Sequence, residues 1–177
     1  MSGKYLITGV AGTGKTAVTD ELARRGWRAY STDEMPEVTQ LEDLRTGEFM
    51  VKDGRPIDFK KYGWNWQEAG LTKLLARAEK VFIGASVSNL HDFCHLFESI
   101  FVLSLDEATL KDRLSSRDKD DDYGKHPDDL ARIFQVMETE KRRLVAHDHA
   151  ILLDASQPLG RLVDELLARV GLSDASV

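Results

Sequence analysis

The octapeptide Gly9-Val10-Ala11-Gly12-Thr13-Gly14-Lys15-Thr16 follows the pattern G-x-x-x-x-G-K-[ST]. An apolar run over 5–8 in front of it predicts a strand, and residues 15–25 predict a helix behind it. This order of strand, loop and helix is the context in which the pattern binds phosphates. We therefore predict a P-loop that binds a nucleoside triphosphate.

The residue types of this loop suit a polyphosphate. Glycines permit the tight turn that points backbone N–H groups inward, and the following helix adds its positive dipole end. Lys15 can reach the β and γ oxygens, and the Thr16 hydroxyl can ligate Mg²⁺. Thr16 is thus the predicted metal ligand. The predicted nucleotide-binding residues of the loop are Gly9, Ala11, Gly12, Thr13, Gly14, Lys15, Thr16 and Ala17.

The composition is that of a globular protein. Its 177 residues fit one α/β domain over 1–177. The net charge of −6 argues against a nucleic acid as the main partner, because such proteins usually present a basic face. We expect no signal peptide and no membrane span, which would need roughly 20 apolar residues in a row. Cys94 is the only cysteine, which excludes an internal disulfide and favours a cytoplasmic location.

Strand and helix patterns alternate nearly to the end of the chain. Apolar runs predict strands at 5–8, 27–31, 81–83, 99–104 and 150–153. Helical spacing predicts helices at 15–25, 32–48, 66–80, 106–117, 127–146 and 158–170. The segment 50–62 interrupts this alternation and is interpreted as an excursion over the sheet edge. Because the apolar strands lack polar alternation, we predict the α/β class, with a parallel sheet covered on both faces.

Four features make the chain resemble the P-loop small-molecule kinases, the group that holds nucleoside monophosphate kinases, shikimate kinase and gluconate kinase. They are the P-loop, Ser31-Thr32-Asp33 after the second strand, Arg113-Leu114-Ser115-Ser116-Arg117 before a charged loop, and Asp154-Ala155-Ser156 after the last strand. The P-loop is specific, and the other three features gain weight from their order. The resemblance covers nearly the whole length.

The resemblance implies a three-layer α/β sandwich around a five-stranded parallel sheet of order 2-3-1-4-5. It also implies an acceptor-binding excursion over about 33–66 and a short lid over about 117–127. The implied activity is transfer of the γ-phosphoryl group of ATP, with Mg²⁺, to a small-molecule acceptor.

The resemblance assigns roles to single residues as well. Lys15, Asp33 and Arg117 would be catalytic, and Arg117 would close onto the phosphates with the lid. Arg113 would bind the nucleotide nearer the base, and Ser156 would border the adenine. The alternative for the two arginines, four residues apart on one helical face, is an exposed helix with ion pairs.

Asp33 follows the second strand at the end of the sheet where open α/β folds bind ligands. In the family an aspartate here often contacts the acceptor hydroxyl or the metal shell. The alternative is a helix cap formed by Asp33 or a neighbour. Gly84-Ala85-Ser86 stands where many P-loop proteins carry an acidic Mg²⁺ ligand, which leaves Asp33 as the nearest acidic candidate. Small residues there would let a ligand approach the strand end.

Trp64-Asn65-Trp66 is the least ordinary tripeptide of the chain. Its indoles could stack on an acceptor ring while the amide hydrogen-bonds it, or they could anchor the excursion in the core. Ser86, Ser88 and Asn89 could bind the acceptor or cap the next helix. The predicted substrate-binding residues are Asp33, Trp64, Trp66, Ser86 and Asn89.

His91 and His95 lie four residues apart with Cys94 between them, a spacing that imitates a metal pair. Because no third ligand stands at a fitting distance, we interpret them as core and surface histidines. His147-Asp148-His149, before the last strand, is interpreted as a solvated turn.

Three functions are compatible with these features. The leading hypothesis is an ATP-dependent kinase whose partner is a small-molecule acceptor. The alternative within enzymes is a nucleoside or nucleoside monophosphate kinase, in which Trp64 or Trp66 stacks on the base. The alternative outside enzymes is a nucleotide-binding regulatory switch, although the guanine-reading Asn-Lys-x-Asp segment of GTP switches is absent. The sequence leaves the acceptor and the oligomeric state open.

Overall fold

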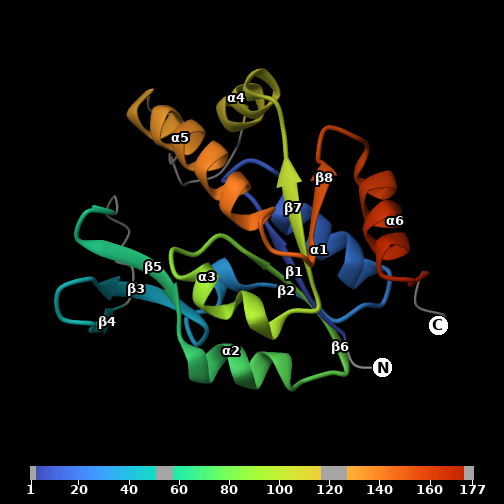
Figure 1. Cartoon of the computed structure of the whole chain (residues 1–177), viewed down its shortest axis with the longest axis horizontal. Helices are drawn as coiled ribbons and strands as arrows, with labels where there is room; N and C mark the ends of the chain where they lie inside the picture. The colour runs from blue at the N-terminus through green and yellow to red at the C-terminus, as the bar shows by residue number, and fades with distance from the viewer. Residues whose placement is uncertain (1–2, 51–57, 117–126, 174–177) are drawn as a thin grey trace.

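The computed structural model describes residues 3–50, 58–116 and 127–173. Its main sheet consists of five parallel strands, β1 (Gly3–Thr8), β2 (Ala29–Ser31), β6 (Lys80–Ala85), β7 (Ser99–Ser104) and β8 (Ala150–Asp154). They lie in the order β2-β6-β1-β7-β8 (Figure 1). Numbered along the chain within this sheet, that is the expected order 2-3-1-4-5.

Helices cover both faces of the sheet. Buried side chains of α1 (Lys15–Arg24), α4 (Glu107–Ser115) and α6 (Leu159–Arg169) pack on one face. Those of α2 (Glu68–Leu75) and α3 (Leu90–Phe93) pack on the other. The helix α5 (Pro127–Leu144) contributes Ile133 to the first face and Leu144 to the second. The chain therefore has the predicted three-layer α/β architecture.

Alternate residues of the same strands build the two faces. In β1, Leu6 packs on the side of α2 and α3, whereas Ile7 packs on the side of α1. Ile83 and Phe82 of β6 divide in the same way. All four side chains are fully buried. Because a parallel strand covered on both faces has no solvent side, these strands are apolar at successive positions.

The predicted helix over 32–48 is wrong. Thr32–Glu34 form one 3-10 turn, η1, and the chain continues as an antiparallel pair, β3 (Thr39–Asp43) and β4 (Phe49–Met50). Pro36 disfavours a helical backbone for the residue before it, and Met35 is extended, with φ of −111° and ψ of 93°. Pro36, which could occupy the first turn of a helix, instead lies between η1 and β3.

A tight turn joins β3 to β4. The Asp43 carboxylate accepts hydrogen bonds from the backbone N–H groups of Arg45 and Thr46, at 2.8 and 3.1 Å. Gly47 follows with a φ of 72°, which L-residues with a side chain rarely adopt. Leu44, within the range 32–48 that was predicted to be helical, is 56% exposed in this turn.

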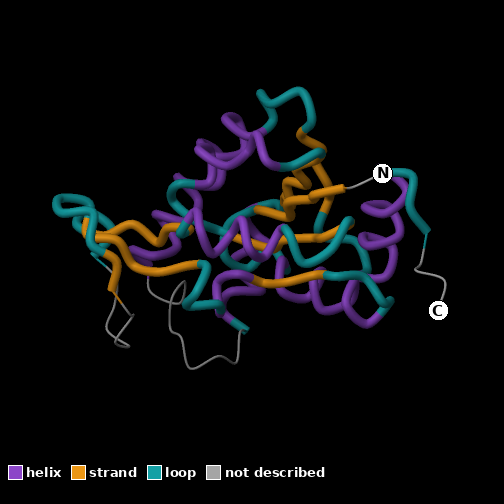
Figure 2. Tube along the Cα trace, turned by 90° about the horizontal axis from the view of Figure 1, so that it is seen from below, coloured by secondary structure: helices purple, strands orange, loops and turns teal. Residues whose placement is uncertain are grey.

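The predicted helix over 66–80 is replaced at its start by a strand. β5 (Tyr62–Trp66) pairs antiparallel with β3, and α2 begins only at Glu68. The predicted excursion thus holds a three-stranded sheet of order β4-β3-β5, which we call the small sheet. The small sheet lies at one end of the molecule, and both chain termini lie toward the other end (Figure 1, Figure 2).

The other predicted strands and helices coincide with observed elements, although β2 begins only at Ala29. Nearly all of the predicted lid over 117–127, including Arg117, lies outside the described residues. Among the helices described, none has the length and apolar character needed to cross a membrane.

Candidate functional site

The P-loop connects the carboxyl end of β1 to the amino end of α1. Gly12 and Gly14 have φ values of 88° and 96°, which glycine alone adopts readily. A Cβ on Gly12 would lie 2.8 Å from Leu110 Cδ1 and 2.9 Å from Leu114 Cδ2. The loop backbone therefore lies directly on α4, and glycine permits both the turn and this close packing.

The Lys15 side chain folds back over the loop that precedes it. Its Nζ donates to the carbonyl oxygens of Gly9 at 2.8 Å and Val10 at 3.1 Å, and the residue is 8% exposed. Thr13 Oγ1 donates to the same Val10 carbonyl at 2.9 Å. The ammonium group is thus held at the P-loop itself, where phosphate oxygens would need a positive charge.

The remaining predicted loop residues differ in their burial. Gly9 has no room for a side chain, since a Cβ would lie 2.7 Å from the Leu103 carbonyl oxygen. Ala11 packs against the core below the loop. Thr16 is half-buried in the first turn of α1, and Ala17 is exposed.

Asp33 lies in η1, directly after β2, and its carboxylate is directed toward the loop that follows β6. Oδ1 accepts from the Ser86 backbone N–H at 3.4 Å, and the Trp64 side chain also donates to this carboxylate. Burial raises the pKa of Asp33, although the Lys15 charge and these hydrogen bonds oppose the shift. Four predicted site residues therefore meet where β1, β2 and β6 end.

The two tryptophans of β5 have different surroundings. Trp66 is 1% exposed, and its Nε1 donates to Thr32 Oγ1 at 2.9 Å. Its ring packs against Phe93 and Phe97, with ring centroids 5.7 and 6.0 Å apart. Trp64 is half-exposed beside the Asp33 carboxylate. Acceptor binding by either indole stays a prediction, and Trp64 has the surroundings that suit it.

Asn89 and Ser88 join the loop after β6 to β5. Asn89 Oδ1 accepts from Trp66 N at 2.9 Å, and its Nδ2 donates to Trp66 O at 3.0 Å. The Ser88 backbone N–H donates to Trp64 O at 2.8 Å, while Ser88 Oγ accepts from Trp64 N at 3.3 Å. These bonds hold the small sheet to the main sheet. Acceptor binding by Asn89 stays a prediction beside this structural role.

Glu42 was not identified from the sequence. Its Oε2 accepts from Asn65 Nδ2 at 2.6 Å across the small sheet. Asn65 Oδ1 and Thr39 Oγ1 are buried, and neither has a hydrogen-bond partner among the residues that the structure describes. No local pattern could have revealed the Glu42–Asn65 pair, because it depends on the β3–β5 register and 39–43 was expected to be helical.

Arg113 links the P-loop to the loop after β8. Its Nη2 donates to Ala155 O at 2.9 Å, and its Nη1 lies 3.8 Å from the position of a Cβ on Gly14. Ser156 is exposed next to Ala155, and its backbone N–H donates to Asp154 Oδ1 at 2.9 Å. The fold thus brings the P-loop, Arg113 and the Ser156 loop together, as the nucleotide-binding prediction requires.

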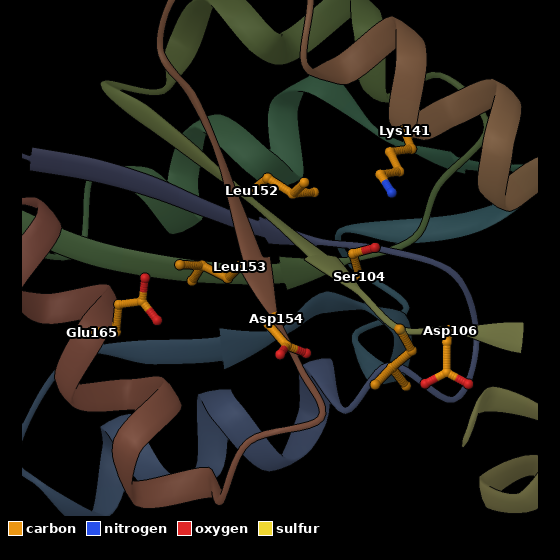
Figure 3. Close-up of a pocket in the computed structure, with 8 residues that line it drawn as sticks. Ser104, Asp106, Lys141, Leu152, Leu153, Asp154 and Glu165 are labelled. Carbon is orange, nitrogen blue, oxygen red and sulfur yellow. The ribbon is translucent and has the colours of Figure 1, made fainter. Parts of the chain in front are cut away.

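A hollow of about 530 Å³ lies over the ends of β7 and β8 (Figure 3). Its charged lining consists of Asp106, Asp154, Glu165 and Lys141. Hydrogen bonds from neighbouring side chains lower the pKa of all three acids, so the hollow is negatively charged at neutral pH. It does not suit a polyphosphate, and none of the predicted site residues lines it.

Residues 6–135 match the model of a protein family described as "AAA domain". The match spans more than half of the chain and includes the P-loop. The chain belongs to this family. No curated protein matches it.

Solved structures show the fold of this P-loop domain in several kinases. A gluconokinase from Sinorhizobium meliloti 1021 is 21% identical with a TM-score of 0.58, covering 94% of this chain and 90% of that chain. Shikimate kinase from Acinetobacter baumannii in complex with shikimate is 17% identical with a TM-score of 0.63, covering 96% and 93%. Deoxyadenosine kinase from M. mycoides with bound dATP is 12% identical with a TM-score of 0.60, covering 96% and 99%. The domain therefore has the fold of the P-loop small-molecule kinases.

Proposed function

We propose that this P-loop domain transfers the γ-phosphoryl group of Mg·ATP to a hydroxyl group of a small-molecule acceptor. One observation carries the proposal: the half-buried Asp33 carboxylate interacts electrostatically with the P-loop Lys15. Phosphoryl transfer uses such a pair, a cation for the phosphate oxygens and a carboxylate for the attacking hydroxyl. The kinases that share the fold support the proposal.

In this mechanism Asp33 accepts the proton of the acceptor hydroxyl. The hydroxyl oxygen forms a bond to the γ-phosphorus, and the bond between that phosphorus and the β–γ bridging oxygen breaks, so that ADP leaves. Lys15 stabilises the negative charge that shifts onto the bridging oxygen. The raised pKa of Asp33 makes it a stronger base than an ordinary aspartate.

The donor groups of the cleft fit Mg²⁺. Thr16 offers a hydroxyl in the first turn of α1, and Asp33 offers a carboxylate near Lys15. Mg²⁺ prefers such hard oxygen ligands together with water and phosphate oxygens. When bound, it would neutralise charge on the β and γ phosphates.

The glycine at the end of β6, Gly84, is explained by packing rather than by the approach of a ligand. A Cβ on Gly84 would lie 2.7 Å from Thr19 Cγ2 of α1. Close packing between α1 and β6 therefore accounts for Gly84, without any need for ligand approach. The absence of an acid from Gly84-Ala85 leaves Asp33 as the candidate for the metal shell.

The adenine is assigned to the space beside Arg113 and the loop at Ala155 and Ser156. A guanidinium group is planar and stacks on aromatic rings, so Arg113 can face a base while its Nη2 stays bonded to Ala155 O. Arg117, outside the described residues, is assigned to the phosphates by its place in the sequence. A cytoplasmic location accords with these assignments.

A nucleoside or nucleoside monophosphate kinase is the second candidate. The observation that favours it is the half-exposed Trp64 indole beside Asp33, where a base could stack while a sugar hydroxyl reaches the carboxylate. A substrate without an aromatic ring would make apolar contacts with the same indole.

The test is ADP release by the purified protein with Mg·ATP, against nucleosides, nucleoside monophosphates, sugar acids and small alcohols. We expect one class to stimulate release, and Lys15→Ala to reduce that stimulation on the order of 10²- to 10³-fold. Stimulation by nucleosides that is lost in Trp64→Leu and kept in Trp64→Phe would favour the second candidate. Tight ATP binding without stimulation by any class would favour a regulatory switch instead.

A further inference from the structure

A cluster of histidine and cysteine side chains lies outside the nucleotide cleft. His91 is in α3, Cys94 begins the following 3-10 turn, η2 (Cys94–Leu96), and His147 is in the turn between α5 and β8. Each offers one ligand atom, and these atoms all lie within 4.8 Å of one another. The sequence placed Cys94 between His91 and His95, and without a third ligand we interpreted these histidines as core and surface residues. The fold supplies the missing third ligand from a segment more than fifty positions away.

The residue types in this cluster suit one class of ligand. Thiolate and imidazole are the preferred ligands of Zn²⁺, with bonds of about 2.3 Å to sulfur and about 2.0 Å to nitrogen. Tetrahedral geometry then places ligand atoms roughly 3.5 Å apart. Closing from the observed spacing needs a shift of about 1 Å, which small side-chain rotations can supply.

Neighbouring groups hold the cluster in place. His91 Nε2 lies 2.9 Å from Glu140 Oε2, which fixes the imidazole ring and leaves its other nitrogen for an ion. Metal-bound histidines are usually oriented by such a carboxylate. The His91 and His147 rings stack, with centroids 5.9 Å apart, and His149 lies beside them with its Nε2 3.4 Å from Cys94 O.

Charged neighbours also favour a cation. The Cys94 thiolate and the Glu140 carboxylate would offset the charge of a divalent ion, and Glu140 also pairs with Arg143 at 3.1 Å. Buried charges are stable only when paired in this way. The buried Cys94 thiol donates to Leu90 O at 3.5 Å.

We propose that His91, Cys94 and His147 form a binding site for a divalent transition-metal ion, which Zn²⁺ fits best, with water in the fourth position. The site is separate from the nucleotide cleft, because the turn that carries His147 lies where β7 and β8 begin, whereas the P-loop follows the end of β1. The ion would join α3 and η2 to the turn that follows α5.

The experiment uses the full chain, stripped with a chelator and titrated with Co²⁺. We expect one Co²⁺ per chain, with the visible bands of a tetrahedral ion and a near-ultraviolet thiolate-to-metal band, and displacement of Co²⁺ by one equivalent of Zn²⁺. No thiolate band, or an octahedral spectrum, would overturn the proposal.

Variants separate this site from adventitious binding. Cys94→Ser should lose the thiolate band, and His147→Asn should weaken Co²⁺ binding more than the 10- to 100-fold typical of losing an outer partner such as Glu140. His95→Asn is the matched control: His95 is exposed and adjacent to Cys94, and its loss should leave the Co²⁺ affinity unchanged. Circular dichroism checks that each variant is folded. Equal Co²⁺ affinity in folded His147→Asn and wild-type protein would contradict the proposal, even if Cys94→Ser fails to fold.

Discussion

Lys15 and Asp33 are two oppositely charged side chains that share a partly buried cleft. The lysine rests on the carbonyl groups of its own loop, and the aspartate accepts hydrogen bonds from Ser86 and Trp64. Burial disfavours the charged carboxylate, and the nearby ammonium group partly offsets this effect. The chemistry of the proposed reaction therefore depends on how these two residues are held.

Lys15→Ala should reduce acceptor-stimulated ADP release on the order of 10²- to 10³-fold, as expected for loss of a group that stabilises transition-state charge. The fold should persist, because the Lys15 side chain bonds the carbonyls of its own loop and is not part of either hydrophobic core cluster. Steady-state kinetics and a thermal unfolding curve measure the two effects. Activity close to wild type would remove Lys15 from the mechanism.

Asp33→Asn should lower kcat on the order of 10²-fold or more if Asp33 is the general base. In the wild-type protein, kcat should fall at acidic pH as Asp33 is protonated, with a midpoint above the ordinary pKa of an aspartate. The measurement is kcat against pH for both proteins. A variant with normal turnover would reduce Asp33 to a structural residue of η1.

The same substitution should stabilise the protein at neutral pH. Since the pKa of Asp33 is raised on folding, the folded state holds its proton more tightly than the unfolded state. The free energy of unfolding therefore falls as the pH rises through the ordinary and then the raised pKa. Asp33→Asn should remove this loss, which chemical denaturation at pH 4 and pH 7 can measure. A lower free energy of unfolding for the variant at pH 7 would contradict this reading of the burial.

At the scale of elements, the small sheet forms the side of the cleft where we propose that the acceptor binds. It projects from the end of the main layers and is held by hydrogen bonds between β5 and the loop after β6. Its innermost indole, Trp66, is in the core, while Trp64 on the same face of β5 is at the cleft. Because Trp66 is anchored in the core, the position of Trp64 at the cleft is fixed as well.

Asn89→Ala should lower the free energy of unfolding by about 1–3 kcal/mol, because it leaves the buried backbone N–H and C=O groups of Trp66 without their partners. It should also raise the KM for the acceptor more than the KM for ATP, because Trp64 and Asp33 lie on the acceptor side. Denaturant unfolding and initial rates measure both. Ser115→Ala, on the exposed side of α4, is the control. A changed acceptor KM with unchanged stability would instead support direct acceptor binding by Asn89.

At the scale of the whole molecule, the central strand β1 connects the two helical layers. Leu6 belongs to one layer and Ile7 to the other, so each layer depends on the same strand. The P-loop begins at the end of this strand, and β6 on one side of it leads to the Ser86 loop. The cleft is therefore positioned by the most deeply buried part of the protein.

Leu6→Ala and Ile7→Ala should each lower the free energy of unfolding by about 2–5 kcal/mol, because each leaves a cavity in the core. Both variants should still unfold in one transition, since the two layers share β1. Leu152→Ala, which removes a side chain 45% exposed on the edge strand β8, should cost about 0.5 kcal/mol or less. Two separate transitions in either core variant would show that the layers unfold independently.

The sequence alone determined the features that depend on neighbouring residues. The P-loop is a local turn, and its conformation depends on its own glycines and lysine. The uninterrupted apolar strands indicate directly that both faces of the sheet are covered. The tertiary structure decided what depends on contacts between distant segments: the small sheet, the Glu42–Asn65 pair, the separate roles of Trp64 and Trp66, and the meeting of His147 with His91 and Cys94. Strand register and packing fix these contacts only once the chain has folded. The residues 32–48 predicted a helix, because their strands depend on the pairing of β3 with β4 and β5.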